Sequence, residues 1–186
     1  MIMKNHPGFT LIELLVTLAI VAIFAMLAVP SFHDIYYRSQ STVIINQVAG
    51  ITRLARNIAV TEVNTTTLCP SLDGLTCTEE WEKGTILFTD ENTNGQVDGN
   101  DKVIRFYRPF IKTGILSWKS LRNKIQFTER GFPRGTVGSF VYCPNNHDSH
   151  LGKSLILSFQ GRLRKGQDSN GDGIIETGSG TNISCS

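Results

Sequence analysis

The feature that most constrains this chain is an apolar run near its N-terminus, from Phe9 to Val29, whose single charged residue is Glu13. A run of about 20 apolar residues is long enough to cross a bilayer as a helix. A carboxylate inside such a helix costs roughly 2.5–3.5 kcal/mol on insertion scales, so it normally has a partner. Lys4 lies close before the run, and the next basic residue after it, Arg38, lies beyond Pro30. Because positive charges next to a membrane segment favour the cytoplasmic side, we expect the N-terminus in the cytoplasm.

Two other interpretations of the run explain less of it. A secretory signal peptide needs a small-residue cleavage site after the apolar stretch, and "FAMLAVPSF" offers a poor one. A plain membrane anchor fits the length of the run but leaves Glu13 unexplained.

The stretch "HPGFTLIELLVTLAIVAIFAMLAVPSF" resembles the class III leader and N-terminal helix of type IV pilins and type II secretion pseudopilins. The resemblance implies that a prepilin peptidase cuts after Gly8, that the new N-terminal Phe9 is methylated, and that Pro30 is the helix-kinking proline. It also implies that Glu13 pairs with the amine at Phe9 of a neighbouring subunit. Because a paired buried charge sets register, Glu13 is expected to serve assembly rather than catalysis.

The rest of the chain predicts an α+β fold, with a long N-terminal helix packed on an antiparallel two-sheet β head. We expect a leader at 1–8, a transmembrane and assembly helix at 9–30, its amphipathic continuation at 31–63 and the head at 64–186. Apolar residues at helical spacing form one packing stripe: Ile44, Val48, Ile51, Ala55 and Ile58. Six short β-branched or aromatic runs then follow: "TTTLCP", "GTILFTD", "KVIRFYR", "KIQFTE", "SFVYC" and "KSLILSFQ".

Three segments of the head are similar to the FimT/GspH group of minor pilins and pseudopilins: "LCPSLDGLTC", "TILFTDENTNGQVDGNDKVIRF" and "LSFQGRLRK". The four cysteines suggest a disulfide-permissive compartment, and their number allows three pairings. We expect Cys69–Cys77 to close a short local loop. Cys143–Cys185 would then fix the Gly/Ser-rich tail.

The cluster "GRLRK" is the densest group of basic residues outside the helix. A net charge of +2 does not indicate a nucleic-acid binder, so a DNA site must rest on such clustering. In a strand, Arg162 and Arg164 project to one side, and we expect both, with Lys165, to contact phosphates while Gly161 and Gly166 permit close approach. The FimT resemblance favours double-stranded DNA, bound without sequence preference, over an ordinary solvated strand face.

Two Asp/Asn-rich loops have the spacing of calcium loops. A β-turn is the favoured interpretation of the first, because its flanks read as strands and Asn-Gly is a hairpin signal. The second lacks an acidic twelfth position. The residues at ligand spacing are Asp90, Asn92, Asn94, Gly95, Asp98 and Asp101 in the first loop and Asp168, Asn170 and Asp172 in the second.

Cys143, His147 and His150 lie close enough in sequence to suggest zinc, but no fourth ligand is apparent and Cys143 is expected in a disulfide. Catalytic and nucleotide-binding motifs are missing from the sequence, so we expect no enzyme and no cofactor.

The leading hypothesis is a FimT-like minor pilin, stored in the bacterial inner membrane with its head in the periplasm and then built into a pilus that takes up DNA. Its partners would be other pilins, prepilin peptidase, membrane lipid and double-stranded DNA. A GspH-like pseudopilin of a type II secretion system is the rival, and a calcium-stabilised surface adhesin is a third class.

Overall fold

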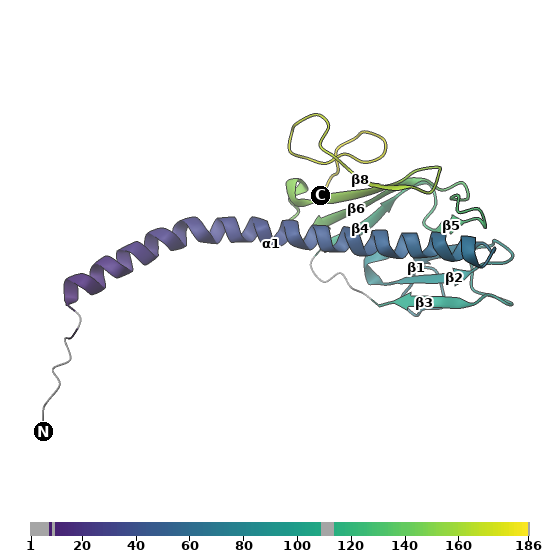
Figure 1. Cartoon of the computed structure of the whole chain (residues 1–186), viewed down its shortest axis with the longest axis horizontal. Helices are drawn as coiled ribbons and strands as arrows, with labels where there is room; N and C mark the ends of the chain where they lie inside the picture. The colour runs from purple at the N-terminus through teal and green to yellow at the C-terminus, as the bar shows by residue number, and fades with distance from the viewer. Residues whose placement is uncertain (1–7, 9, 109–113, 186) are drawn as a thin grey trace, which may run out of the picture. The chain divides into compact units, whose positions relative to one another are not determined.

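A computed structural model describes residues 8, 10–108 and 114–185, without the side chains of residues 27–31 and 33. The chain divides into two compact units, residues 1–37 and 38–186. One helix, α1 (Leu11–Thr61), provides most of the first unit and begins the second (Figure 1).

The first unit consists of the N-terminal part of α1. Thr10 caps the helix: its Oγ1 accepts a hydrogen bond from the Glu13 N–H at 3.3 Å, and its carbonyl accepts one from Leu14. Glu13 and its apolar neighbours are exposed in this single chain. Among the described residues, no helix is both long enough and apolar enough to cross a membrane. Phe9 lies outside the described residues, and Pro30 lies within α1.

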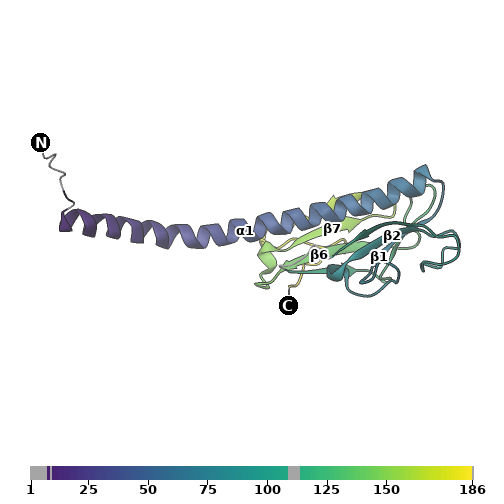
Figure 2. The same ribbon diagram turned by 90° about the horizontal axis from the view of Figure 1, so that it is seen from below.

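In the second unit, the apolar stripe of α1 faces the core as predicted. Ile44, Val48, Ile51 and Ala55 are buried and Ile58 packs against them from the edge. Three more residues widen the stripe, because Ile45, Ala49 and Ala59 are also buried. Figure 2 shows this part of the helix running along the strands of both sheets.

The head contains two four-stranded sheets in which every pairing is antiparallel, as the sequence indicated. Short 3-10 helices, η1 (Trp81–Lys83) and η2 (Ser149–Leu151), lie between strands. One sheet has the order β3 (Val103–Tyr107), β2 (Thr85–Thr89), β1 (Thr66–Pro70), β5 (Ile125–Phe127), and the other β4 (Gly114–Lys119), β6 (Gly138–Pro144), β7 (Lys153–Leu157), β8 (Leu163–Lys165).

Strand β4 was not among the six expected runs. It pairs with β6 along its whole length and turns Leu116 and Trp118 inward. The ring of Trp118 lies 4.5 Å from that of Phe140, and Trp81 of η1 packs edge-on against Phe140 at 4.9 Å. This aromatic group joins the 3-10 helix that precedes β2 to the core face of the β4–β6 pair.

Candidate functional site

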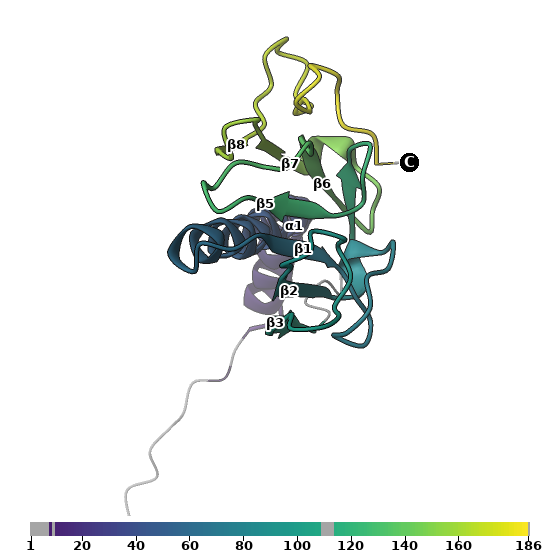
Figure 3. The same ribbon diagram turned by 90° about the vertical axis from the view of Figure 1, so that its right-hand side faces the viewer.

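The predicted basic cluster lies on a β-hairpin formed by β7 and β8. The turn is closed by bonds from the Ser158 N–H to the Arg162 carbonyl (3.0 Å) and from the Gly161 N–H to the Ser158 carbonyl (2.9 Å). Gly161 has a φ of 72°, a conformation that glycine adopts without strain. Strand β8 is the edge strand of its sheet (Figure 3), so only one side of it pairs with another strand, β7.

The hairpin register separates the three predicted contact residues. Arg164 pairs with Ile156 and Lys165 with Leu155. Because Leu155 belongs to the core that includes α1, Lys165 projects toward the helix side of the sheet and Arg164 toward the outer face. Because successive side chains of an extended chain point to opposite faces, Arg162, two residues before Arg164, also projects toward the outer face. The structure therefore places Lys165 on the opposite face of β8 from Arg164, and its contact with phosphate stays a prediction.

The two flanking glycines, Gly161 and Gly166, are not on the surface where a DNA backbone could approach them. A side chain at Gly161 would approach the Gly131 carbonyl to 2.5 Å, and one at Gly166 would collide with Ser154 and with the Glu176 carbonyl. Both glycines are buried. They allow close packing inside the protein rather than the approach of a DNA backbone.

The outer face of the hairpin adds residues that the sequence interpretation missed. Arg164 lines a depression of about 460 Å³ together with Lys119 of β4 and Phe159 of the hairpin turn. Phe159 is 76 % exposed, so the basic residues do have an aromatic neighbour. Its position two residues before Gly161 in "SFQGR" is a sequence signal that could have indicated this.

A second turn, residues 128–134, lies against the hairpin. Its Gly131 carbonyl packs on Gly161 and accepts a 2.9 Å hydrogen bond from Arg56 Nε of α1. This turn carries four exposed side chains, which are Glu129, Arg130, Phe132 and Arg134. We call Lys119, Phe159, Arg162 and Arg164, which lie on the β7–β8 hairpin or line the depression beside it, the outer basic surface. The sequence could not predict it, because Lys119 lies 40 residues before Phe159 in the chain.

The first Asp/Asn-rich loop connects β2 to β3, which pair antiparallel across it. Asp90 is fully buried, and its Oδ2 accepts hydrogen bonds from Thr67, Gln126 and the Gly95 N–H, while its Oδ1 has no partner. The other carboxylates bond within the loop: Asp98 accepts from the amides of Asn92 and Asn94, and Asp101 accepts from the N–H groups of Glu91 and Asp98.

The second loop is closed in the same way. Both oxygens of Asp168 accept backbone N–H groups, from Gly171 and Gly173. Hydrogen bonds from the Ile174 N–H and from the Asn182 and Asn170 amides lower the pKa of Asp172. Within the described parts of the chain, no three His, Cys, Asp or Glu side chains are placed to hold a metal ion.

Both disulfides join the expected pairs. Cys69 is bonded to Cys77, and Cys143 is bonded to Cys185. Cys143 is therefore not a zinc ligand, and His147 Nδ1 instead lies 2.9 Å from the Cys185 carbonyl oxygen.

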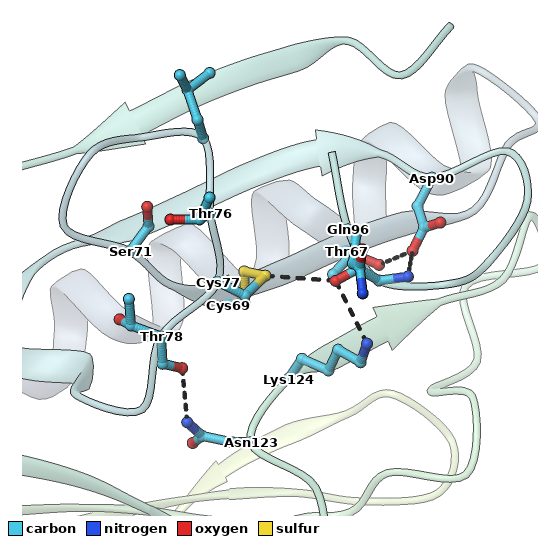
Figure 4. The surroundings of a disulfide bond; sticks show 12 residues. Thr67, Cys69, Ser71, Thr76, Cys77, Thr78, Asp90, Gln96, Asn123 and Lys124 are labelled. Carbon is cyan, nitrogen blue, oxygen red and sulfur yellow. Dashed lines mark hydrogen bonds between the residues drawn. A yellow bond between two sulfur atoms is a disulfide. The ribbon is translucent and has the colours of Figure 1, made fainter. Parts of the chain in front are cut away.

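Figure 4 shows the Cys69–Cys77 disulfide and, beside it, the hydrogen bond from the Asn123 amide to the Thr78 carbonyl at 3.0 Å. The loop that the disulfide closes is ordered by hydrogen bonds to Asp73. Asp73 accepts from the Leu75 and Thr76 N–H groups, both at 2.8 Å, and from the Thr76 and Ser71 hydroxyls. These bonds hold the pKa of Asp73 well below its usual range, and the two backbone N–H groups, Thr76 and then Leu75, have the largest effect.

Comparison with known proteins decides the family. Residues 45–161, well over half of the chain, match the family described as Type II transport protein GspH. The chain belongs to the GspH family. Residues 3–29 also match the prokaryotic N-terminal methylation motif, the segment with Gly8, Phe9 and Glu13.

Solved structures support the pilin-like fold of this GspH-family chain. The type IV minor pilin FimU of Pseudomonas aeruginosa superposes with a TM-score of 0.58 at 20% identity, over 80% of this chain and 97% of FimU. A fimbrial protein of P. aeruginosa is 38% identical over 55 residues, 30% of this chain and 36% of that protein. Fimbrial protein Q of Moraxella bovis is 40% identical over 48 residues, 26% of this chain and 31% of that protein. The chain spans about a third of these fimbrial proteins.

Proposed function

We propose that this GspH-family protein is a minor type IV pilin that assembles into a pilus and binds extracellular DNA for uptake in natural transformation. The observation that carries the proposal is the outer basic surface. Arg162 and Arg164 project from one face of an edge hairpin. Lys119 and Phe159 line the depression that Arg164 also lines. The role is structural and binding rather than enzymatic.

The chemistry of the outer basic surface suits the DNA backbone. Guanidinium groups form paired hydrogen bonds to phosphates, and release of counterions supplies sequence-independent affinity. An exposed phenylalanine adds contact area without reading a base edge. We therefore expect double-stranded DNA to bind weakly and with little sequence preference.

The N-terminal segment supplies the proposed assembly chemistry. Cleavage after Gly8 creates an amine at Phe9, and the exposed Glu13 carboxylate is available to the amine of a neighbouring subunit. Before assembly the apolar segment would hold the protein in the inner membrane, with its head in the periplasm and its leader on the cytoplasmic side, where prepilin peptidase would remove it.

A pseudopilin of a type II secretion system is the second candidate. It is favoured by the family match and by two exposed leucines, Leu72 and Leu75, in the disulfide loop closed by Cys69 and Cys77. Exposed apolar side chains on an ordered loop suit contact with protein partners.

A complementation experiment separates the candidates. A deletion strain receives the wild-type protein, the Arg162→Gln/Arg164→Gln variant, or Lys165→Gln as a control from the opposite face of the same strand. We expect the arginine variant to lose transformation while pili still form, and the control to behave as wild type. Loss of protein secretion on deletion, with transformation unchanged, would favour the pseudopilin.

A further inference from the structure

A second group of basic side chains lies on the helix side of the β7–β8 hairpin. Lys165 pairs with Leu155, and Lys153 is two residues before Leu155 on the same face of β7. Such diagonal neighbours have Cα atoms about 7–8 Å apart, within reach of long side chains. Arg38 of α1 is close enough to Lys153 to repel its positive charge, as Lys165 does. We call Arg38, Lys153 and Lys165 the helix-side cluster.

Among the described residues, no carboxylate acts on the pKa of Lys153. Burial first, and then the charges of Arg38 and Lys165, lower the pKa of Lys153. The carboxylate nearest to Arg38 in sequence is Asp34, and counting it still leaves a net positive charge.

The two lysines line a small depression of about 160 Å³, together with Thr42, Ile45 and Ser154. Pockets for drug-sized ligands are larger, about 300–1,000 Å³, so this one suits a compact group. The two hydroxyl groups already donate hydrogen bonds within the protein. Thr42 donates to the Arg38 carbonyl at 2.8 Å, and Ser154 donates to the Glu176 carbonyl at 2.7 Å. The side-chain groups left at the depression to donate to a ligand are the two ammonium groups.

We propose that the helix-side cluster binds a phosphate group at a site separate from the DNA-binding surface. The two ammonium groups that line the small depression match the charge and size of one phosphate, and an anion there relieves their repulsion with each other and with the nearby charge of Arg38.

The expected source of the phosphate is the headgroup of an anionic phospholipid. Arg38 follows the apolar run by nine residues, which as a helix span about 13 Å, and basic residues just beyond such a segment attract anionic lipids. The choice of lipid rests on the proposed membrane insertion, whereas the phosphate site itself does not.

The test uses the full chain in a maltoside detergent. Native mass spectrometry measures the retention of phosphatidylglycerol and of zwitterionic phosphatidylcholine. The Lys153→Gln/Lys165→Gln variant is compared with Arg162→Gln/Arg164→Gln, which removes the same charge from the other face. We expect phosphatidylglycerol affinity to fall about fivefold for each charge removed from the helix-side cluster and to stay unchanged in the arginine variant.

A second measurement tests the site without lipid. Inorganic phosphate is added to the wild-type chain, and the titration of Lys153 is followed by NMR. We expect the pKa of Lys153 to rise, because a bound anion favours the charged ammonium. A rise without preference for phosphatidylglycerol would support the site and overturn the lipid source. No rise and no lipid preference would overturn the proposal.

DNA binding by the same variants distinguishes this proposal from the proposed function. If the lysine variant lost DNA affinity as the arginine variant does, the cluster would belong to the DNA surface and the proposal would be wrong. If the arginine variant kept its DNA affinity while lipid binding still required the lysines, the proposed DNA function would fail and the phosphate site would stand. Thermal melts confirm that all variants are folded.

Discussion

Removal of each disulfide gives a prediction whose size follows from the fold. The Cys143–Cys185 bond closes a loop with a sequence separation of 42, and Cys69–Cys77 one of 8. The longer loop includes the tail from Gly166 to Cys185, whose described residues form no strand of either sheet. Ile183 of the tail is buried in a small cluster with both bonded cysteines of the longer loop. The bond therefore anchors a segment that has few other apolar contacts.

Loop-closure entropy gives the magnitude. For loops of 42 and 8 residues it predicts that removal of the bond lowers the free energy of unfolding by about 4 and about 2.5 kcal/mol at 25 °C. The Cys143→Ser/Cys185→Ser variant is thus expected to be less stable than Cys69→Ser/Cys77→Ser by about 1.5 kcal/mol. Loss of the buried packing at Ile183 adds to the difference in the same direction.

Urea unfolding of the full chain in detergent measures both changes. The fluorescence of Trp81 and Trp118 reports on the core, because both rings are buried in it. Limited proteolysis provides a second readout, since the tail is expected to be cut first in the Cys143→Ser/Cys185→Ser variant. Equal losses of stability in the two variants, or a larger loss for the short loop, would refute the reasoning.

Three further predictions concern the N-terminus and the short disulfide loop. Intact mass of the membrane-extracted protein is expected to show cleavage after Gly8 and a methylated Phe9, whereas a cut near residue 28 would indicate a secretory signal. Glu13→Ala is expected to leave the head folded but to exclude the subunit from fibres, and normal assembly would contradict the charge pairing. Asp73 is expected to titrate by NMR well below about 3.9. Because its folded pKa is lowered, its contribution to loop order is present above the unfolded pKa and is lost as the pH falls through the folded value.

Local sequence patterns predicted much of the fold. The spacing from Ile44 to Ile58 predicted the buried face of α1, and dense β-branched runs predicted the strands other than β4 and β8. Strand β4 was not predicted, because its inward residues, Leu116 and Trp118, alternate with Ser117 and Lys119 and the segment has few β-branched residues. Strict alternation was the signal that could have identified it.

The candidate site was predicted less completely. Alternation along β8 already implied that Lys165 points away from Arg164, once that segment is taken as a strand. The roles of Gly161 and Gly166 depend on what packs against them, which is set by turns distant in sequence. The meeting of residues 128–134 with the hairpin is a tertiary contact, so the sequence alone carried no sign of it.

The salt dependence of DNA binding tests the central claim most directly. Binding of a DNA duplex to the full chain is measured from low to high salt for the wild type, for Arg162→Gln/Arg164→Gln and for the control Lys153→Gln/Lys165→Gln. If both arginines contact phosphates, the arginine variant binds more weakly and its log–log salt slope is shallower by about 1.8, at about 0.9 per contact. The control keeps the wild-type slope. Equal affinity and slope in comparably folded wild-type and arginine-variant proteins would contradict the assignment of DNA binding to the outer basic surface.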